Sequence, residues 1–90
     1  MYFEWDDNKA EYNKKTHKVT FDEVKEAFFD PSAMDAYDET HSIQEARYNL
    51  IGMSRRRLLF IVYSEPRIGV VRIISARKAE RKHQQIYVQK

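Results

Sequence analysis

The sequence contains no cysteine and only two glycines and two prolines among its 90 residues. Without cysteine, the chain has no disulfide scaffold, no thiolate zinc site and no cysteine nucleophile. Gly52 and Gly69 each stand alone, so no glycine-rich loop is present to cradle a phosphate. No apolar run approaches the roughly 18 residues that span a bilayer, and the aromatic, acidic start does not resemble a secretory signal. We therefore expect one cytoplasmic domain over residues 1–90, without membrane contact.

Charge is divided unevenly along the chain, although the net charge is only +2. Residues 1–45 hold five lysines, no arginine and twelve acidic residues, whereas residues 46–90 hold eight arginines, three lysines and two acidic residues. A basic half that is rich in arginine suits the recognition of phosphate. An equally simple interpretation is that the two halves neutralise each other within the folded domain.

The first half of the chain predicts an aromatic strand followed by two helices. Asp6 is a suitable N-cap for a polar helix. A second helix begins more clearly, because Thr20 and Glu23 form an S/T-x-x-E capping box and an amphipathic pattern follows. Asp30-Pro31 ends this helix, since the residue before a proline is disfavoured in helical conformation. These elements are expected at residues 2–5, 7–16 and 21–29.

The second half predicts an antiparallel β meander and a terminal helix, and the fold class is therefore α+β. The strand over residues 57–63 is nearly all apolar, which is typical of a central strand covered on both faces. A turn at residues 65–69 connects it to the last strand. The expected elements are a short strand at 33–37, strands at 47–51, 57–63 and 70–75, and a helix at 77–88.

Arg72 interrupts the apolar last strand, where a charge is costly if its face is packed. One register of the last hairpin pairs Ser64 with Val70. It places Arg57 opposite Arg77 and leaves Arg72 on the other face of the sheet. A slip of one residue puts Arg72 on the face of Arg57 instead. Either register brings two guanidinium groups together, which requires an anion or a carboxylate between them; an ion pair with an N-terminal carboxylate is the structural alternative.

The histidines do not predict a metal site. His17, His41 and His83 lie far apart in the sequence and form no local pair with ligand spacing such as H-x-x-x-H. His17 stands among Lys14, Lys15 and Lys18, whose positive charge disfavours the charged imidazolium and favours a neutral ring that can act as a base. A solvated basic helix end is the alternative interpretation. No cofactor is predicted.

Short motifs in a fixed order carry a family resemblance. The first group comprises Phe3-Glu-Trp-Asp6, Lys9, Asn13, His17-x-Val19-x-Phe21 and Phe29-Asp-Pro31. The second group comprises Asp38-x-x-His41-Ser42, Glu45-x-Arg47, Leu50-Ile-Gly52, Arg57-Leu-Leu and Arg72-Ile-Ile-Ser-Ala-Arg77-Lys-Ala79. From residue 3 to about residue 87 the chain resembles the BrnT family, the toxins of a bacterial type II toxin–antitoxin pair. It departs from the family pattern at Thr16-His17-Lys18, at His83-Gln84 and in the turn at 65–69.

The resemblance implies a RelE-like α+β fold and a ribonuclease that arrests translation. It also implies neutralisation by a BrnA-like antitoxin, a ribbon-helix-helix DNA-binding protein, so that DNA is contacted only through the complex. Cleavage of RNA without a metal needs a base, an acid and cations for the developing phosphorane charge. We assign the cationic role to Arg72 and Arg77, assisted by Arg57, and proton transfer to His17. Further candidates are Glu45 and Arg47 in the catalytic site, and Lys15, Lys18 and Tyr87 in RNA binding.

A non-enzymatic binding module is the alternative function. In this interpretation the domain serves as the partner and co-repressor of an antitoxin, and its basic face recognises an acidic segment. The charge division and the acidic stretch at residues 30–45 are compatible with it. Growth arrest on overexpression distinguishes the toxin from the binding module.

Overall fold

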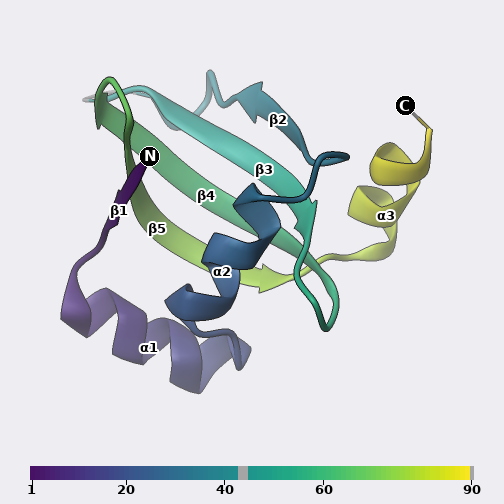
Figure 1. Cartoon of the computed structure of the whole chain (residues 1–90), viewed down its shortest axis with the longest axis horizontal. Helices are drawn as coiled ribbons and strands as arrows, with labels where there is room; N and C mark the ends of the chain where they lie inside the picture. The colour runs from purple at the N-terminus through teal and green to yellow at the C-terminus, as the bar shows by residue number, and fades with distance from the viewer. Residues whose placement is uncertain (43–44, 90) are drawn as a thin grey trace.

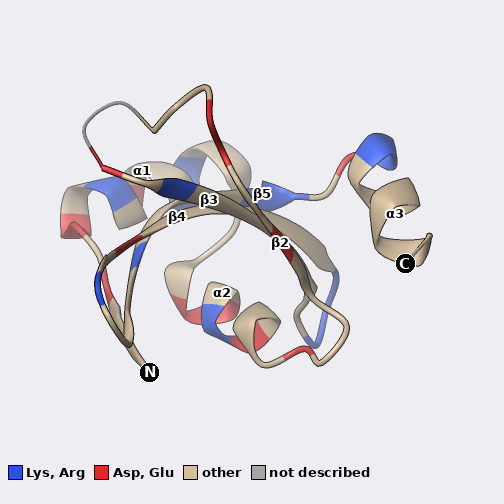
Figure 2. Ribbon diagram, turned by 90° about the horizontal axis from the view of Figure 1, so that it is seen from above, with Lys and Arg blue, Asp and Glu red and all other residues tan. Residues whose placement is uncertain are grey.

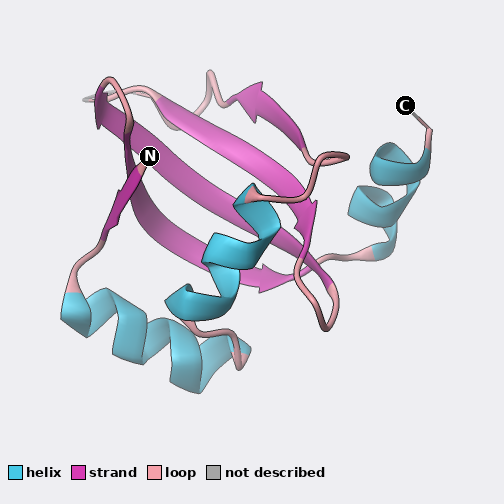
Figure 3. Ribbon diagram, in the orientation of Figure 1, coloured by secondary structure: helices cyan, strands magenta, loops and turns pink. Residues whose placement is uncertain are grey.

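The structure is a computed structural model that describes residues 1–42 and 45–89. It contains a five-stranded mixed sheet with strand order β1-β5-β4-β3-β2, and three helices (Figures 1 and 3). The strands are β1 (Tyr2–Glu4), β2 (Met34–Tyr37), β3 (Arg47–Met53), β4 (Leu58–Arg67) and β5 (Val70–Lys78), and the helices are α1 (Asp7–His17), α2 (Phe21–Phe28) and α3 (Arg81–Val88). The α+β class predicted from the sequence is confirmed.

The two N-terminal helices begin where their capping residues predict. The Asp6 carboxylate accepts hydrogen bonds from the backbone N–H groups of Asn8 and Lys9 at the start of α1. The Thr20 hydroxyl accepts one from the Glu23 N–H at the start of α2. α1 ends at His17 and is capped by Lys18, whose φ of 59° is left-handed. None of the helices in the described part of the chain is long and apolar enough to cross a membrane.

The hydrophobic core lies between α2 and one face of the sheet. Leu59 and Ile61 of β4 are fully buried there, and Ile73 of β5 is almost so. α2 lies on that side of the sheet only (Figure 2). The opposite face, called the open face below, carries Phe60 and Val62, which are half-buried. The prediction that β4 is covered on both faces holds in part: α3 covers the open face at Phe60, where the His83 ring stacks with centroids 4.1 Å apart, but Phe60 and Val62 are only half-buried.

The hairpin of β4 and β5 is longer and tighter than the sequence predicts. Arg67 pairs with Val70, so only Ile68 and Gly69 form the turn, and Gly69 has a left-handed φ of 83°. The register also shifts at two irregular positions along the hairpin. Both predicted registers are wrong for these reasons. The directly paired residues are Ser64 with Arg72, and Phe60 with Arg77.

The ends of the sheet differ from prediction in two further ways. β1 joins the sheet parallel to β5, with Glu4 opposite Arg72, so the sheet is mixed. β5 continues to Lys78, and α3 begins only at Arg81 instead of at residue 77. Continued pairing with β4 explains the longer strand, since Leu59 still pairs with Lys78.

Candidate active site on the open face of the sheet

Four polar residues form one row across the open face, which we call the arginine row. Glu4 pairs with Arg72, Arg72 with Ser64, and Ser64 with Arg47 across β1, β5, β4 and β3. Directly paired residues project from the same face of a sheet, and neighbouring strands are about 4.8 Å apart. The α-carbons of Arg72 and Arg47 are therefore separated by about 10 Å. Two predicted site residues thus lie on one face within reach of a common anion.

Carboxylates hold the Arg72 guanidinium within this row. Arg72 Nε donates to Glu4 Oε2 at 2.8 Å, and Arg72 Nη1 donates to Glu45 Oε2 at 3.2 Å. The hydrogen bond to Glu4 is the main cause that raises the pKa of Arg72. The ion pair with an N-terminal carboxylate, stated above as the structural alternative, is thus present. The same contacts orient the guanidinium, and among the described residues Arg72 Nη2 makes no hydrogen bond.

The next two rows on the open face supply an apolar floor and a third arginine. Asn49, Val62 and Ser75 pair across β3, β4 and β5. Phe60 pairs with Arg77 in the following row, and the Arg77 guanidinium carbon lies 5.6 Å from the centre of the Phe60 ring. Arg77 therefore shares the open face with Arg72 and Arg47. The sheet brings these three arginines to one surface.

A hollow of about 340 Å³ lies over Asn49, Val62, Ser75 and Phe60 of these rows, and Arg47 is the residue of the arginine row that lines it. Its polar lining includes Arg47, Asn49 and Ser75, and its apolar lining includes Phe60, Val62 and Ile74. Asp38 and His41, from the segment after β2, complete the lining. The hollow thus combines a cation, a histidine and an apolar floor, which suits a phosphate carrying a nucleobase.

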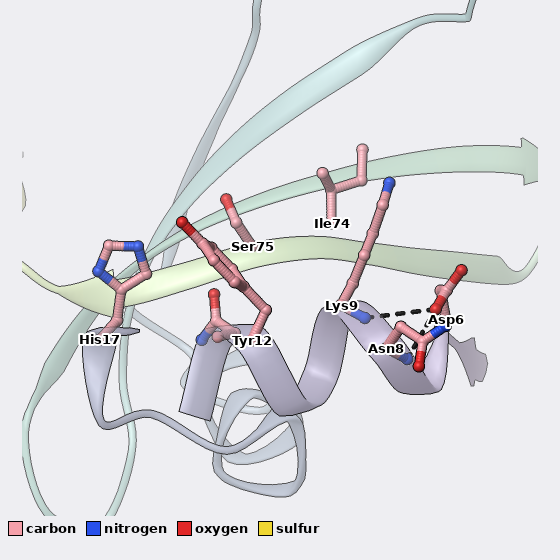
Figure 4. A pocket seen from close by; sticks show the side chains of 8 residues that line it. Asp6, Asn8, Lys9, Tyr12, His17, Ile74 and Ser75 are labelled. Atoms are coloured by element: carbon pink, nitrogen blue, oxygen red, sulfur yellow. Dashed lines mark hydrogen bonds between the residues drawn. The ribbon is translucent and has the colours of Figure 1, made fainter. Parts of the chain in front are cut away.

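A second hollow, of about 360 Å³, lies between α1 and β5 and contains His17. Lys9, Tyr12 and His17 extend from α1 toward the part of β5 that carries Ile74 and Ser75 (Figure 4). Ile74 and Ser75 line both hollows, so the two adjoin along β5. The hollow that contains His17 therefore adjoins the hollow that Arg47 lines.

Asn13 fixes α1 in this position. Its side-chain amide donates to the carbonyl oxygens of Val19 and Ala76, at 2.9 Å and 2.8 Å, and accepts from the Ala76 N–H at 3.0 Å. The residue is 2% exposed. It pairs with the backbone of β5 beyond the point where β1 ends, and so positions His17 one helical turn further on.

The structure separates the remaining candidates from this surface. Lys15 and Lys18 are exposed and line a different hollow on α1 with Glu11 and Thr20, and Lys18 Nζ donates to the Lys15 carbonyl oxygen at 2.9 Å. Tyr87 Oη donates to Asp30 Oδ2 at 2.6 Å, beside the C-terminal end of β3. The arginine row crosses β3 at its first residue, about 20 Å away along the strand.

Arg57 has a different environment from the other arginines. Its Nε and Nη2 atoms donate to the two carboxylate oxygens of Glu23 at 3.0 Å and 2.8 Å, and Nη2 also donates to the Lys18 carbonyl oxygen at 2.7 Å. Glu23 accepts a further bond from the Ser54 hydroxyl at 2.8 Å. Arg57 therefore joins α2 to the β3–β4 turn and does not lie opposite Arg77 as predicted.

This pairing also shifts the pKa of the Glu23 carboxyl. The hydrogen bond from Arg57 lowers the pKa of the Glu23 carboxyl, and this effect outweighs the burial that raises it. The same bond raises the pKa of Arg57. The Glu23 side chain, predicted to complete a capping box, is thus engaged with Arg57 and Ser54.

Sequence reasoning missed several residues of this surface: Lys9, Tyr12, Ser64 and Ser75. Lys9 and His17 are eight residues apart on α1, and this spacing places them on one side of the helix. That signal was available in the sequence. The positions of Ser64 and Ser75 on this surface depend on strand register, so the sequence held no signal for them. Within the described residues, no three His, Asp or Glu side chains gather into a group that could hold a metal ion.

Comparison with known proteins identifies the family. The profile described as "Ribonuclease toxin, BrnT, of type II toxin-antitoxin system" matches residues 5–83. The chain belongs to the BrnT family. This membership confirms the resemblance found in the sequence, and it implies ribonuclease activity and an antitoxin partner. A comparison with curated proteins finds no match.

The fold agrees with that of a solved BrnT structure. The chain is similar to the Brucella abortus ribonuclease toxin, BrnT, known from a crystal structure at 1.1 Å resolution. The TM-score is 0.70 at 19% sequence identity, and the similarity covers 90% of this chain and 99% of the Brucella chain. At this identity the likeness establishes the fold alone.

Proposed function

We propose that this chain is a toxin that cleaves RNA without a metal ion and thereby arrests translation. The observation that carries the proposal is the arginine row, in which Arg72 and Arg47 flank Ser64 on the open face beside a hollow with an apolar floor. Arginine binds phosphate with paired, charge-assisted hydrogen bonds. The row and hollow fit one phosphate of an RNA strand together with an adjoining base.

In the proposed reaction, the 2′-hydroxyl of the RNA attacks the neighbouring phosphorus and the bond to the 5′ oxygen breaks. Arg72 and Arg47 bind the non-bridging oxygens, and Arg77 adds positive charge from the same face. Glu4 and Glu45 hold Arg72 so that its free Nη2 points to the phosphate. His17, which lines the adjoining hollow with Ser75, transfers a proton. All the charge stabilisation comes from guanidinium groups.

The antitoxin is proposed to be a BrnA-like ribbon-helix-helix protein that covers the open face and blocks the arginine row. DNA is then bound only through the antitoxin. An acidic or helical segment of the antitoxin complements the three arginines. Co-expression with such an antitoxin restores growth, and hydrogen exchange of the complex shows protection of β3 and β5. Protection restricted to the acidic residues 30–39 would contradict the blocking mechanism.

The cleavage reaction is tested with purified protein and an RNA oligonucleotide in EDTA. We expect products with 2′,3′-cyclic phosphate or 3′-phosphate ends, and no cleavage when the attacking nucleotide is 2′-deoxy. Strict dependence on magnesium, or products with a 5′-phosphate, would refute this mechanism. Growth arrest on expression in bacteria distinguishes the toxin from a binding module, which leaves growth unchanged.

A further inference from the structure

Asp38, His41 and Ser42 form a closed turn between β2 and β3. The Asp38 N–H donates to the Arg47 carbonyl oxygen at 2.8 Å, which continues the pairing of the two strands by one residue. The Ser42 hydroxyl donates to the Asp38 carbonyl oxygen and accepts from the Arg47 N–H at 2.8 Å. These bonds fix the start of the turn directly beside Arg47, at the end of the arginine row.

Within this turn the Asp38 carboxylate holds the His41 imidazole. Asp38 Oδ2 lies 2.9 Å from His41 Nδ1, and Asp38 Oδ1 accepts from the His41 backbone N–H at 3.3 Å. Burial raises the pKa of the Asp38 carboxyl, but the bonds from the His41 ring and from the backbone of His41 and Thr40 together lower it. A charged Asp38 carboxylate accepts a proton from Nδ1, so the tautomer of the His41 ring that fits this contact presents Nε2 as an acceptor.

Asp38 is mostly buried and His41 is mostly exposed, as expected of a carboxylate that orients a ring and a ring that exchanges a proton with a substrate. The Asp38 side chain is 15% exposed, whereas the His41 side chain is 67% exposed. A mostly buried carboxylate thus orients a ring that a substrate can reach. The His41 ring lines the same hollow as Arg47 and Ser75. The charged or polar groups that share this hollow with the ring are Asp38 from the turn, Arg47 and Asn49 from β3, and Ser75 from β5.

We propose that His41 is a second catalytic residue, the general base, and that Asp38 is its positioning residue. The assignment rests on the proposed RNA cleavage. His41 Nε2 takes the proton from the 2′-hydroxyl as its oxygen bonds to phosphorus, and Asp38 stabilises the resulting imidazolium. The bond to the 5′ oxygen breaks, and His17 gives a proton to that oxygen; His17 must therefore enter the reaction protonated and act as the acid, not as the base expected from its lysine neighbours. One proton is taken and one is given, so the reaction balances.

The base is identified with two RNA substrates that differ in one atom. The first is ordinary RNA, and the second carries sulfur in place of the bridging 5′ oxygen. The sulfur leaves as a thiolate and needs no proton, so the second substrate needs the base but not the acid. We expect His41→Ala to lower the cleavage rate by about 10²–10⁴ on both substrates. The His17→Ala variant is expected to cleave ordinary RNA slowly and to cleave the sulfur substrate at close to the wild-type rate.

Asp38→Asn tests the positioning role, with Glu39→Gln as the matched control because it removes a neighbouring exposed carboxylate. We expect Asp38→Asn to lower the rate and move the acidic limb of the pH–rate profile to lower pH, since the imidazolium loses its carboxylate partner. Glu39→Gln leaves rate and profile unchanged. An unaltered rate in His41→Ala, or its restoration by the sulfur substrate, would overturn the assignment. Wild-type products that carry a 5′-phosphate would instead refute the cleavage mechanism itself.

Discussion

Replacing Arg57 by methionine is expected to destabilise the protein without altering the cleavage step. Methionine keeps the apolar stem but removes every donor to Glu23 and to the Lys18 carbonyl oxygen. The Glu23 side chain is 8% exposed and that of Arg57 is 23% exposed. Breaking a fully buried ion pair costs about 3–5 kcal/mol, and the partial exposure of Arg57 reduces this to about 2–3 kcal/mol.

The expected loss corresponds to a fall in Tm of about 10–20 °C for a domain of this size. The assays are thermal unfolding by circular dichroism and the rate of RNA cleavage well below the Tm. The double variant Glu23→Gln with Arg57→Met is the control, since removing both charges leaves no buried carboxylate unpaired. It should regain most of the lost stability.

The pH dependence of stability provides a further check on this pair. Arg57 holds the pKa of Glu23 below its usual value of 4.5, so the stabilising contribution is present above that pH and is lost as the pH falls below it. Arg57→Met removes this part of the acid sensitivity. An unchanged Tm combined with a hundredfold slower cleavage would refute this reasoning and return Arg57 to the catalytic site.

Three further predictions concern other parts of the molecule. Arg72→Ala should lower the cleavage rate by about 10²–10³ and leave the Tm nearly unchanged, because its ion pairs are half-exposed; unfolding of the variant would show a structural role. Gly52→Ala should lower the free energy of unfolding in urea by about 1–3 kcal/mol, since the added Cβ would lie 2.7 Å from the Ala27 carbonyl oxygen; an unchanged urea midpoint would contradict this. Burial, with Lys82 nearby, lowers the pKa of His83 from 6.5, so stability should decline as the pH falls below about 6.5, and His83→Leu should remove that decline.

The helices and the central strand could be predicted because their signals are local. Asp6 and Thr20 mark helix starts through bonds to residues two or three positions away. The apolar run of β4 needs no knowledge of its partners. The short strand β2 was also predicted, and it occupies residues 34–37 within the expected range.

The arrangement of the arginines could not be predicted, because it depends on pairing between distant segments. Arg57 precedes one apolar strand and Arg72 lies within another, yet Arg57 is joined to Glu23 on α2 and Arg72 to Glu4 on β1. The shifts in the β4–β5 register also decide which face each residue occupies. A shift of one residue reverses every face, and the sequence carries no separate signal for such irregularities.

The pairing of β1 with β5 has a consequence for how the protein folds. Glu4 and Arg72 are partners although they lie near opposite ends of the chain, so the sheet has a high contact order at this edge. Closing so long a loop is entropically costly, and parallel pairing of distant segments forms slowly. We therefore expect β1 to dock late, after the β3–β4–β5 meander has formed. During synthesis, a nascent chain acquires its complete arginine row only after β5 has left the ribosome.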